Sequence, residues 1–163
     1  MIACSVLNKK IENISDFIKN SRFISKYFKG IPRERLYMSI LFLKENKDHK
    51  IKDFEKSLDS AFSYIDNFKM DIDSTYMYPN SKIGIKLLLR DESIFCIMSN
   101  LRNEAQTKYD INKNEVIFHV TLARCFKHIE EADVQNVNLE FLKLTDMTGK
   151  IEYIVLDKPK III

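Results

Sequence analysis

The sequence contains few glycines and few cysteines, and both shortages exclude classes of protein. Its 163 residues include only three Gly, namely Gly30, Gly84 and Gly149, so it holds neither a GxGxxG dinucleotide loop nor a GxxxxGK phosphate loop. The three Cys are odd in number, lie far apart and form no CxxC pair. A disulfide scaffold and a cysteine zinc site are therefore not expected, and a reducing cytoplasm is the compartment that this cysteine usage favours.

Long apolar runs are missing as well. The longest apolar stretch near the start, residues 2–7, is followed at once by Asn8, Lys9 and Lys10. It is too short for a signal peptide or a membrane span, so no membrane partner is expected. With 45% hydrophobic and 30% charged residues, the composition is that of one soluble domain covering residues 1–163.

The net charge of +3 is distributed unevenly along the chain. Residues 19–56 contain 11 Lys and Arg against 5 acidic residues, so this segment carries +6 and the remainder carries −3. Such asymmetry suggests an anionic partner that approaches from this segment, although a solvated lysine-rich face is the commoner explanation.

The spacing of apolar residues predicts helices and strands in a mixed order. Apolar residues repeat every three or four positions where helices are expected, over residues 11–18, 51–65 and 93–105. Asp91 and Ser93 supply capping side chains for the last of these helices. Shorter apolar or alternating runs predict strands over residues 2–7, 36–43, 68–72, 83–89, 116–123, 139–144 and 151–156, with turns at 78–81 and 147–149. Because this order mixes hairpins with crossovers, the class is α+β and the sheet is largely antiparallel.

Two predicted strands carry the same pattern, an aromatic ring followed two positions later by a hydroxyl. The rings are Tyr37 and His119, about half the chain apart, and the hydroxyls belong to Ser39 and Thr121. Because side chains alternate along a strand, each ring shares a face with its hydroxyl. Phosphodiester chemistry uses a group that titrates near neutrality and neutral donors for phosphate oxygens, which His119 and Thr121 supply. One HxT tripeptide alone is weak evidence, because a strand histidine is more often structural.

The longer context of both patterns resembles a known family. Residues 118–124, Phe-His-Val-Thr-Leu-Ala-Arg, resemble the second signature, HxTLAR, of the two-histidine (2H) phosphoesterase superfamily. The likeness is specifically to the RNA 2′,3′-cyclic phosphodiesterases once called 2′-5′ RNA ligases. Residues 35–45 resemble the first signature of that family, LHxTLxFLGE. The turn at 78–81 and a final hairpin over residues 142–156 are also similar to features of the family.

This resemblance implies a bilobal α+β fold, in which two mostly antiparallel sheets face a groove and the helices lie outside. One HxT from each half meets at a phosphate, without metal or cofactor. It implies His119 and Tyr37 as catalytic residues and Thr121, Ser39 and Arg124 as phosphate-binding residues. The implied partners are RNA ends, small cyclic nucleotides or 2′-5′ oligonucleotides, and the chain is expected to be a monomer.

The first signature departs from the family at three positions, with Tyr37 for His, Ser39 for Thr and Lys44 for Gly. Serine keeps the hydroxyl. A phenol with a pKa of about 10 is almost fully protonated at neutral pH, so it cannot serve as a base but can donate a proton. The division of roles would then be His119 as base and Tyr37 as acid, in a slow phosphodiesterase.

Two other interpretations remain open. In the first, the chain binds a nucleotide or an RNA end without turnover, and Tyr37 stacks on a base. In the second, the motif survives only as packing. Arg124 and Lys44 either contact the phosphate or stay solvated, and Tyr76 and Tyr78 either border the groove or pack at a strand edge. His49 and His128 are expected to be exposed and without a role.

Overall fold

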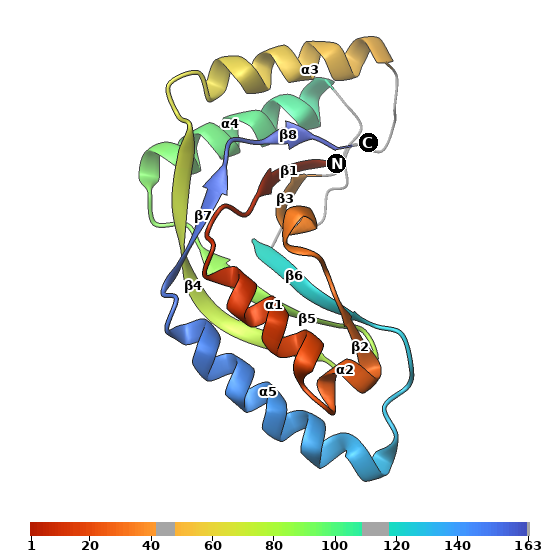
Figure 1. The fold of residues 1–163 in the computed structure, drawn as a ribbon. Coiled ribbons are helices and arrows are strands. Elements are labelled where there is room, and N and C mark those ends of the chain that lie inside the picture. The colour runs from red at the N-terminus through yellow and green to blue at the C-terminus, as the bar shows by residue number, and fades with distance from the viewer. Residues whose placement is uncertain (42–47, 109–117, 163) are drawn as a thin grey trace.

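A computed structural model describes residues 1–41, 48–108 and 118–162 (Figure 1). These residues form eight strands, which are β1 (Ile2–Ser5), β2 (Phe28–Gly30), β3 (Tyr37–Leu41), β4 (Asn67–Tyr78), β5 (Lys82–Leu88), β6 (His119–Cys125), β7 (Tyr153–Asp157) and β8 (Lys160–Ile161). The α-helices within the same residues are α1 (Ile11–Asn20), α2 (Ile24–Tyr27), α3 (Asp48–Ala61), α4 (Glu92–Lys108) and α5 (Val134–Gly149). Short 3-10 turns, η1 (Arg33–Arg35) and η2 (Glu131–Asp133), precede β3 and α5.

The strands form one curled sheet, in the order β7-β4-β5-β6-β3-β1-β8, with β2 paired to β6. Every pairing is antiparallel. The two expected sheets are thus two halves of a continuous sheet, joined where Met38 of β3 pairs with Val120 of β6. An isolated bridge between Val6 and Leu156 brings the β1 side back towards β7. The expected α+β class with a mostly antiparallel sheet is confirmed.

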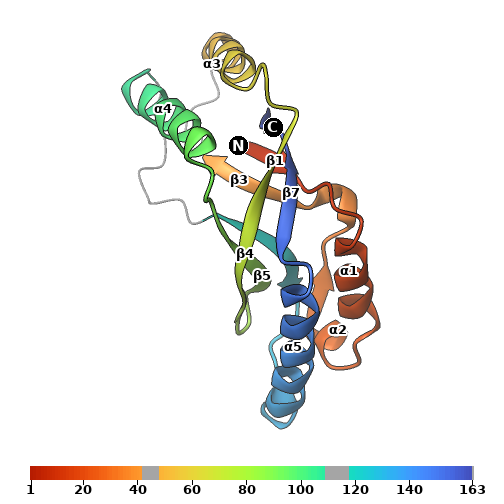
Figure 2. The ribbon, with the colours of Figure 1, turned by 90° about the vertical axis from the view of Figure 1, so that its left-hand side faces the viewer.

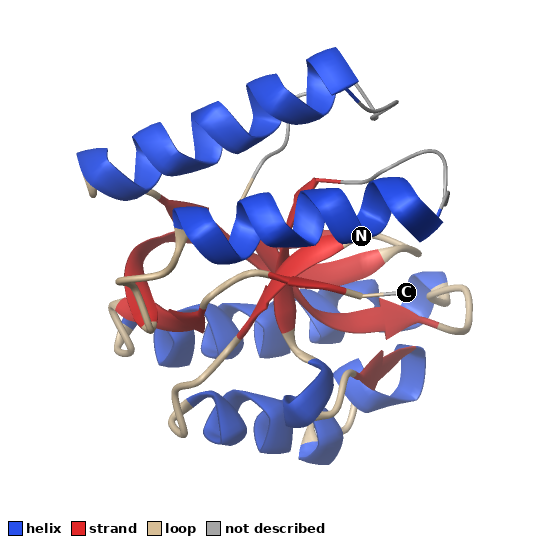
Figure 3. Cartoon of the chain, turned by 90° about the horizontal axis from the view of Figure 1, so that it is seen from above, coloured by secondary structure: helices blue, strands red, loops and turns tan. Residues whose placement is uncertain are grey.

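The helices lie outside the sheet at its two ends. Figures 1 and 2 both show α3 and α4 at one end and α1, α2 and α5 at the other. Seen from above in Figure 3, the strands lie between helices on either side. The apolar stripes predicted for the helices form the core, with fully enclosed side chains such as Ile14 of α1, Phe54 of α3 and Ala105 of α4. Burial of each large aliphatic or aromatic side chain contributes about 1.5–3 kcal/mol.

The strand predicted over residues 139–144 and the turn at 147–149 are wrong, because α5 runs through both. Val137, Leu144 and Thr148 are buried and Phe141 packs against the core, a spacing of three and four that only a helix presents on one face. The expected final hairpin over 142–156 is likewise wrong in its first arm, whereas its second arm is β7, which pairs with β4. A window of six residues contained too little of the helical period to distinguish the two structures.

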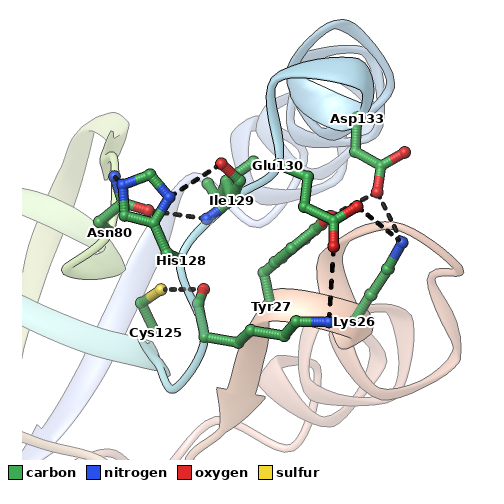
Figure 4. Close-up of polar contacts among 9 residues, drawn as sticks. Lys26, Tyr27, Asn80, Cys125, His128, Ile129, Glu130 and Asp133 are labelled. Carbon is green, nitrogen blue, oxygen red and sulfur yellow. Dashed lines mark hydrogen bonds and ion pairs between the residues drawn. The ribbon is translucent and has the colours of Figure 1, made fainter.

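The turn predicted at residues 78–81 is present and is anchored from outside (Figure 4). Asn80 has a positive φ of 60°, and its side-chain carbonyl accepts a hydrogen bond of 2.9 Å from the backbone N–H of Ile129. Further along this connection to α5, the Asp133 carboxylate accepts hydrogen bonds from Tyr27 and, at 2.7 Å, from Lys26. The segment between β6 and α5 therefore ties the β4–β5 turn to α2.

Candidate active site

The β3–β6 pairing brings the two sequence patterns together. Met38 pairs with Val120 in an antiparallel register, so the preceding and following residues place Tyr37 opposite Thr121 and Ser39 opposite His119. Met38 and Val120 are both fully buried behind the sheet. Because side chains alternate along each strand, the two rings and two hydroxyls lie together on the other face.

That face forms one wall of a groove of about 590 Å³. All five residues predicted for the site line it, and they are Tyr37, Ser39, His119, Thr121 and Arg124. The remaining lining residues are Met1, Lys29, Gly30, Ile31, Pro32, Arg35 and Lys82. The volume lies in the range of small-molecule sites, so a nucleotide-sized ligand fits.

Arg124 reaches the groove because β6 contains a bulge. Strict alternation would point Arg124 away from the face that carries His119 and Thr121. The register, however, shifts by one residue beside Leu122, since Ile83 pairs with Ala123 while Gly84 pairs with Thr121. A bulge of this kind reverses the alternation beyond it and re-aims the side chains that follow.

The groove is positively charged. Among its lining residues Lys29, Arg35, Lys82 and Arg124 are cationic and none is acidic. Two of the four come from the basic segment at 19–56, whereas Lys56 of the same segment borders a different surface, between α3 and α4. The charge therefore suits an anionic ligand such as a phosphodiester.

The Ser39 hydroxyl is already oriented in the groove. It donates a hydrogen bond of 3.1 Å to the Sδ atom of Met1. A thioether sulfur is a weak acceptor, so a phosphate oxygen entering the groove would be a better partner for this hydroxyl.

Tyr76, whose position the sequence left undecided, packs beside the groove on the same face of the sheet as Thr121. Its ring lies edge-on to the His119 imidazole, with 6.2 Å between centroids, and crosses Gly84, its cross-strand partner. A Cβ atom at Gly84 would lie 2.4 Å from the Tyr76 hydroxyl, so only glycine leaves room for the ring. A glycine inside a strand signals such a close approach, and Gly84 in the run Ile-Gly-Ile was that signal.

The Tyr76 hydroxyl is enclosed and makes no regular hydrogen bond within the described residues. Burial raises the pKa of this phenol above its ordinary value, while the Thr121 hydroxyl and the Arg124 charge nearby act in the opposite direction. Tyr76 thus lies on the groove face beside His119 and Thr121, and it supports these side chains without lining the groove itself.

Other candidates lie elsewhere. His128 is exposed and faces Asn80 on the outer side of the β4–β5 turn, at 3.4 Å, as expected of a residue without a role in the groove (Figure 4). Tyr78 is also exposed, and its ring is tilted by 39° against that of Tyr76 with 4.9 Å between centroids. Lys44 and the side chain of His49 lie outside the described residues.

Within residues 1–41, 48–108 and 118–162, no three His, Cys, Asp or Glu side chains gather closely enough to hold a metal ion. No helix in the same ranges has the length and apolar character needed to cross a membrane.

Comparison with known proteins was informative only at the level of structure. No family model matches the chain, and no curated protein matches its sequence. Among solved structures, Usb1 of Kluyveromyces marxianus with uridine monophosphate is 10% identical, with a TM-score of 0.58 over 95% of this chain and 90% of that one. LigT of E. coli complexed with 3′-AMP is 18% identical, with a TM-score of 0.54 over 79% and 74% of the two chains.

A third structure, described as a phosphoesterase, is 14% identical with a TM-score of 0.59 over 79% and 75% of the two chains. The chain has the 2H phosphoesterase fold. In this 2H fold the pair of motifs that the sequence resemblance singled out lies on the face of β3 and β6 that lines the groove. At 10–18% identity the comparisons establish the fold, and the reaction has to be argued from the groove.

Proposed function

We propose that residues 1–163 form one bilobal domain that hydrolyses RNA 2′,3′-cyclic phosphates or 2′-5′ linkages by acid–base catalysis without a metal. One observation carries the proposal. Tyr37, Ser39, His119 and Thr121, from two distant stretches of sequence, line one groove whose charged residues are all cationic. The nucleotides bound by Usb1 and LigT, uridine monophosphate and 3′-AMP, support a nucleotide or RNA end as the partner.

In the proposed reaction His119 acts as the base. Its neutral imidazole takes a proton from a water molecule, and the water oxygen forms a new bond to phosphorus. The bond from phosphorus to one ribose oxygen breaks, and Tyr37 donates its phenolic proton to that leaving oxygen. The proton on His119 and the proton missing from Tyr37 then exchange with solvent, which restores both groups.

The remaining residues hold the phosphate. The Ser39 and Thr121 hydroxyls donate hydrogen bonds to its non-bridging oxygens, and the Arg124 guanidinium supplies positive charge as negative charge develops. Since a phenol is a poorly matched acid at neutral pH, turnover is expected to be slow.

A second candidate function follows from Tyr37 itself. With a phenol in the place of a histidine, the groove would bind a nucleotide or RNA end without turnover, and the Tyr37 ring would stack on a base. Binding without product formation separates this function from hydrolysis.

The deciding experiment is incubation of the protein with a nucleoside 2′,3′-cyclic phosphate, followed by identification of the product by mass spectrometry. We expect slow formation of a nucleoside monophosphate that persists in excess chelator and is abolished by His119→Ala. His128→Ala, which removes an exposed histidine outside the groove, is the matched control and should retain activity. Activity that disappears with the chelator, or survives His119→Ala, would refute the proposed mechanism.

The proposed setting is a monomer in the cytoplasm. None of the three cysteines forms a disulfide, and Cys96 is exposed as a free thiol. Free thiols persist in a reducing compartment.

A further inference from the structure

A row of three cations crosses the sheet at one end of the groove. On β6, Arg124 pairs with Lys82 of the neighbouring β5 and with Lys29 of β2 on its other side. All three side chains line the groove. We call Lys29, Arg124 and Lys82 the cation row.

The cation row is electrostatically unfavourable without a ligand. Like charges directly opposite one another on neighbouring strands destabilise a sheet. No ion pair joins Lys29, Lys82 or Arg124 to an acidic residue in the part of the chain that the structure describes. An anion lying across the three strands would relieve this repulsion.

Apart from Arg124, the row lies away from His119 and the two hydroxyls proposed to hold the reacting phosphate. Arg124 is three residues beyond Thr121 on β6, about 10 Å along an extended strand and somewhat less across the bulge. With strands about 4.8 Å apart, the three Cα atoms of the row span about 10 Å across the sheet. One phosphate held between His119 and the two hydroxyls therefore does not neutralise the whole row.

A second cavity continues the groove beyond β2. It measures about 780 Å³ and shares four consecutive residues, Lys29 to Pro32, with the groove. Phe126, 62% exposed, borders this cavity and presents a ring on which a nucleobase can stack. Its charged lining is mixed, with Glu12 and Asp16 beside Lys19, Lys29 and Arg33, and Arg33 is paired with Glu12 at 2.7 Å. The cavity therefore favours a further phosphate less than the wholly cationic groove does.

We propose that the cation row is a subsite for a second phosphate, so that the substrate is an oligonucleotide with a phosphodiester next to the reacting phosphate. This inference rests on the proposed function of the same groove. The Arg124 guanidinium, with five N–H donors, lies between the two phosphates and contacts both, while Lys29 and Lys82 contact the second. The next nucleoside then extends over β2 towards Phe126.

The test compares three ligands that are not substrates. They are adenosine 3′-phosphate, a 3′-5′-linked diadenylate ending in a 3′-phosphate, and the same diadenylate with a neutral methylphosphonate in place of its internal phosphodiester. The last two differ only in the charge of the second phosphate. Dissociation constants are measured by calorimetry for wild type, for the double variant Lys29→Gln/Lys82→Gln, and for Lys143→Gln, which removes an exposed lysine of α5 outside the groove.

We expect wild type to bind the charged diadenylate about tenfold or more tightly than the methylphosphonate, as for hydrogen bonds between charged groups. The double variant should bring this ratio close to one, and Lys143→Gln should leave it unchanged. Thermal unfolding of each variant checks that it is folded.

Two results overturn the inference in distinguishable ways. If wild type binds the two diadenylates equally, or the double variant weakens all three ligands in the same proportion, the row serves the reacting phosphate alone. In that case cyclic-phosphate hydrolysis by wild type remains and the proposed function stands. If wild type neither hydrolyses a cyclic mononucleotide nor binds any of the three ligands, the proposed function and this inference both fail.

Discussion

Tyr37 lies opposite Thr121 on the groove face, and the proposed mechanism gives it the place of a proton-transferring histidine. An imidazole at this position would enter the same groove and titrate near neutrality. We therefore expect Tyr37→His to raise the rate of cyclic-phosphate opening. The increase should not exceed the contribution of general acid–base catalysis, which is about 10²–10⁴-fold. The measurement is the initial rate of nucleoside monophosphate formation at neutral pH.

The comparison needs His119→Ala in both backgrounds, because His119 is the only histidine that lines the groove among the described residues. The His119→Ala substitution should abolish activity whether position 37 holds Tyr or His. A Tyr37→His variant slower than wild type would contradict the prediction and would mean that the phenol works as the acid or stacks on a base.

At the level of elements, the Tyr76 ring crosses Gly84 on the groove face, so the pairing of β4, β5 and β6 there depends on a residue without a side chain. A Cβ atom at Gly84 would lie 2.4 Å from the Tyr76 hydroxyl and 2.7 Å from the backbone carbonyl of Val120. Since backbone cannot move aside cheaply, Gly84→Ala should lower the free energy of unfolding by about 1–3 kcal/mol or more. Urea denaturation measures the change.

Gly149 provides the matched control for that substitution. A Cβ atom there meets nothing within 4 Å, and the residue ends α5 without a positive φ. Gly149→Ala should therefore be neutral or raise stability by up to about 1 kcal/mol, as helix propensity predicts. Equal losses of stability in the two variants would show that the Tyr76 crossing does not constrain the sheet.

Asp133, at the start of α5, makes the attachment of this helix to α2 sensitive to acid. The hydrogen bond from Lys26, and then that from Tyr27, lowers the pKa of the Asp133 carboxyl below its usual value of 3.8. The unfolded chain thus takes up a proton here at higher pH than the folded chain does. The stabilisation is complete above the usual pKa and is lost as pH falls below about 4 through the lowered value.

We expect Asp133→Asn to lower the free energy of unfolding at neutral pH. Below about pH 4, the free energy of unfolding of the variant should change less with pH than that of wild type. Urea denaturation at a series of acid pH values measures both effects. Asp146→Asn, which changes an exposed aspartate of α5 with no ion pair in the described residues, is the control. A wild-type pH dependence retained by Asp133→Asn would contradict this assignment.

The sequence predicted those elements whose pattern is local. The stripes of α1, α3 and α4 and the alternation in β3 and β6 are visible within ten to fifteen residues, roughly the window that periodicity needs. The whole of α5 was missed, because the exposed Leu139 and Leu142 extend the apolar run at 139–144 and obscure its helical spacing. β2, β8 and α2 have four residues or fewer and depend on their partners, as where Glu140 of α5 accepts hydrogen bonds from the backbone N–H groups of Phe23 and Ile24, at 2.8 and 2.9 Å.

At the scale of the whole molecule, the site combines residues that sequence distance conceals. Alternation was enough to place Tyr37, Ser39, His119 and Thr121 on two polar faces, and the family resemblance was needed to bring those faces together. Lys29 and Lys82 could not be predicted, because their approach to Arg124 depends on long-range register and on a bulge in β6. Neither feature leaves a local pattern in the sequence.

The cationic lining of the groove leads to a prediction about the whole protein and RNA. Each cation that neutralises a phosphate of a single strand releases a condensed counterion, which contributes about −0.7 to the slope of log affinity against log salt. Lys29, Arg35, Lys82 and Arg124 together allow a slope of up to about −3.

We expect the affinity for a short single-stranded RNA, measured by fluorescence anisotropy between about 50 and 200 mM salt, to fall with such a slope. Lys82→Gln should make the slope shallower by about 0.7, whereas Lys143→Gln on α5 should not change it. A slope near zero would mean that RNA does not contact these cations, and the lysine-rich surface would then be only solvated.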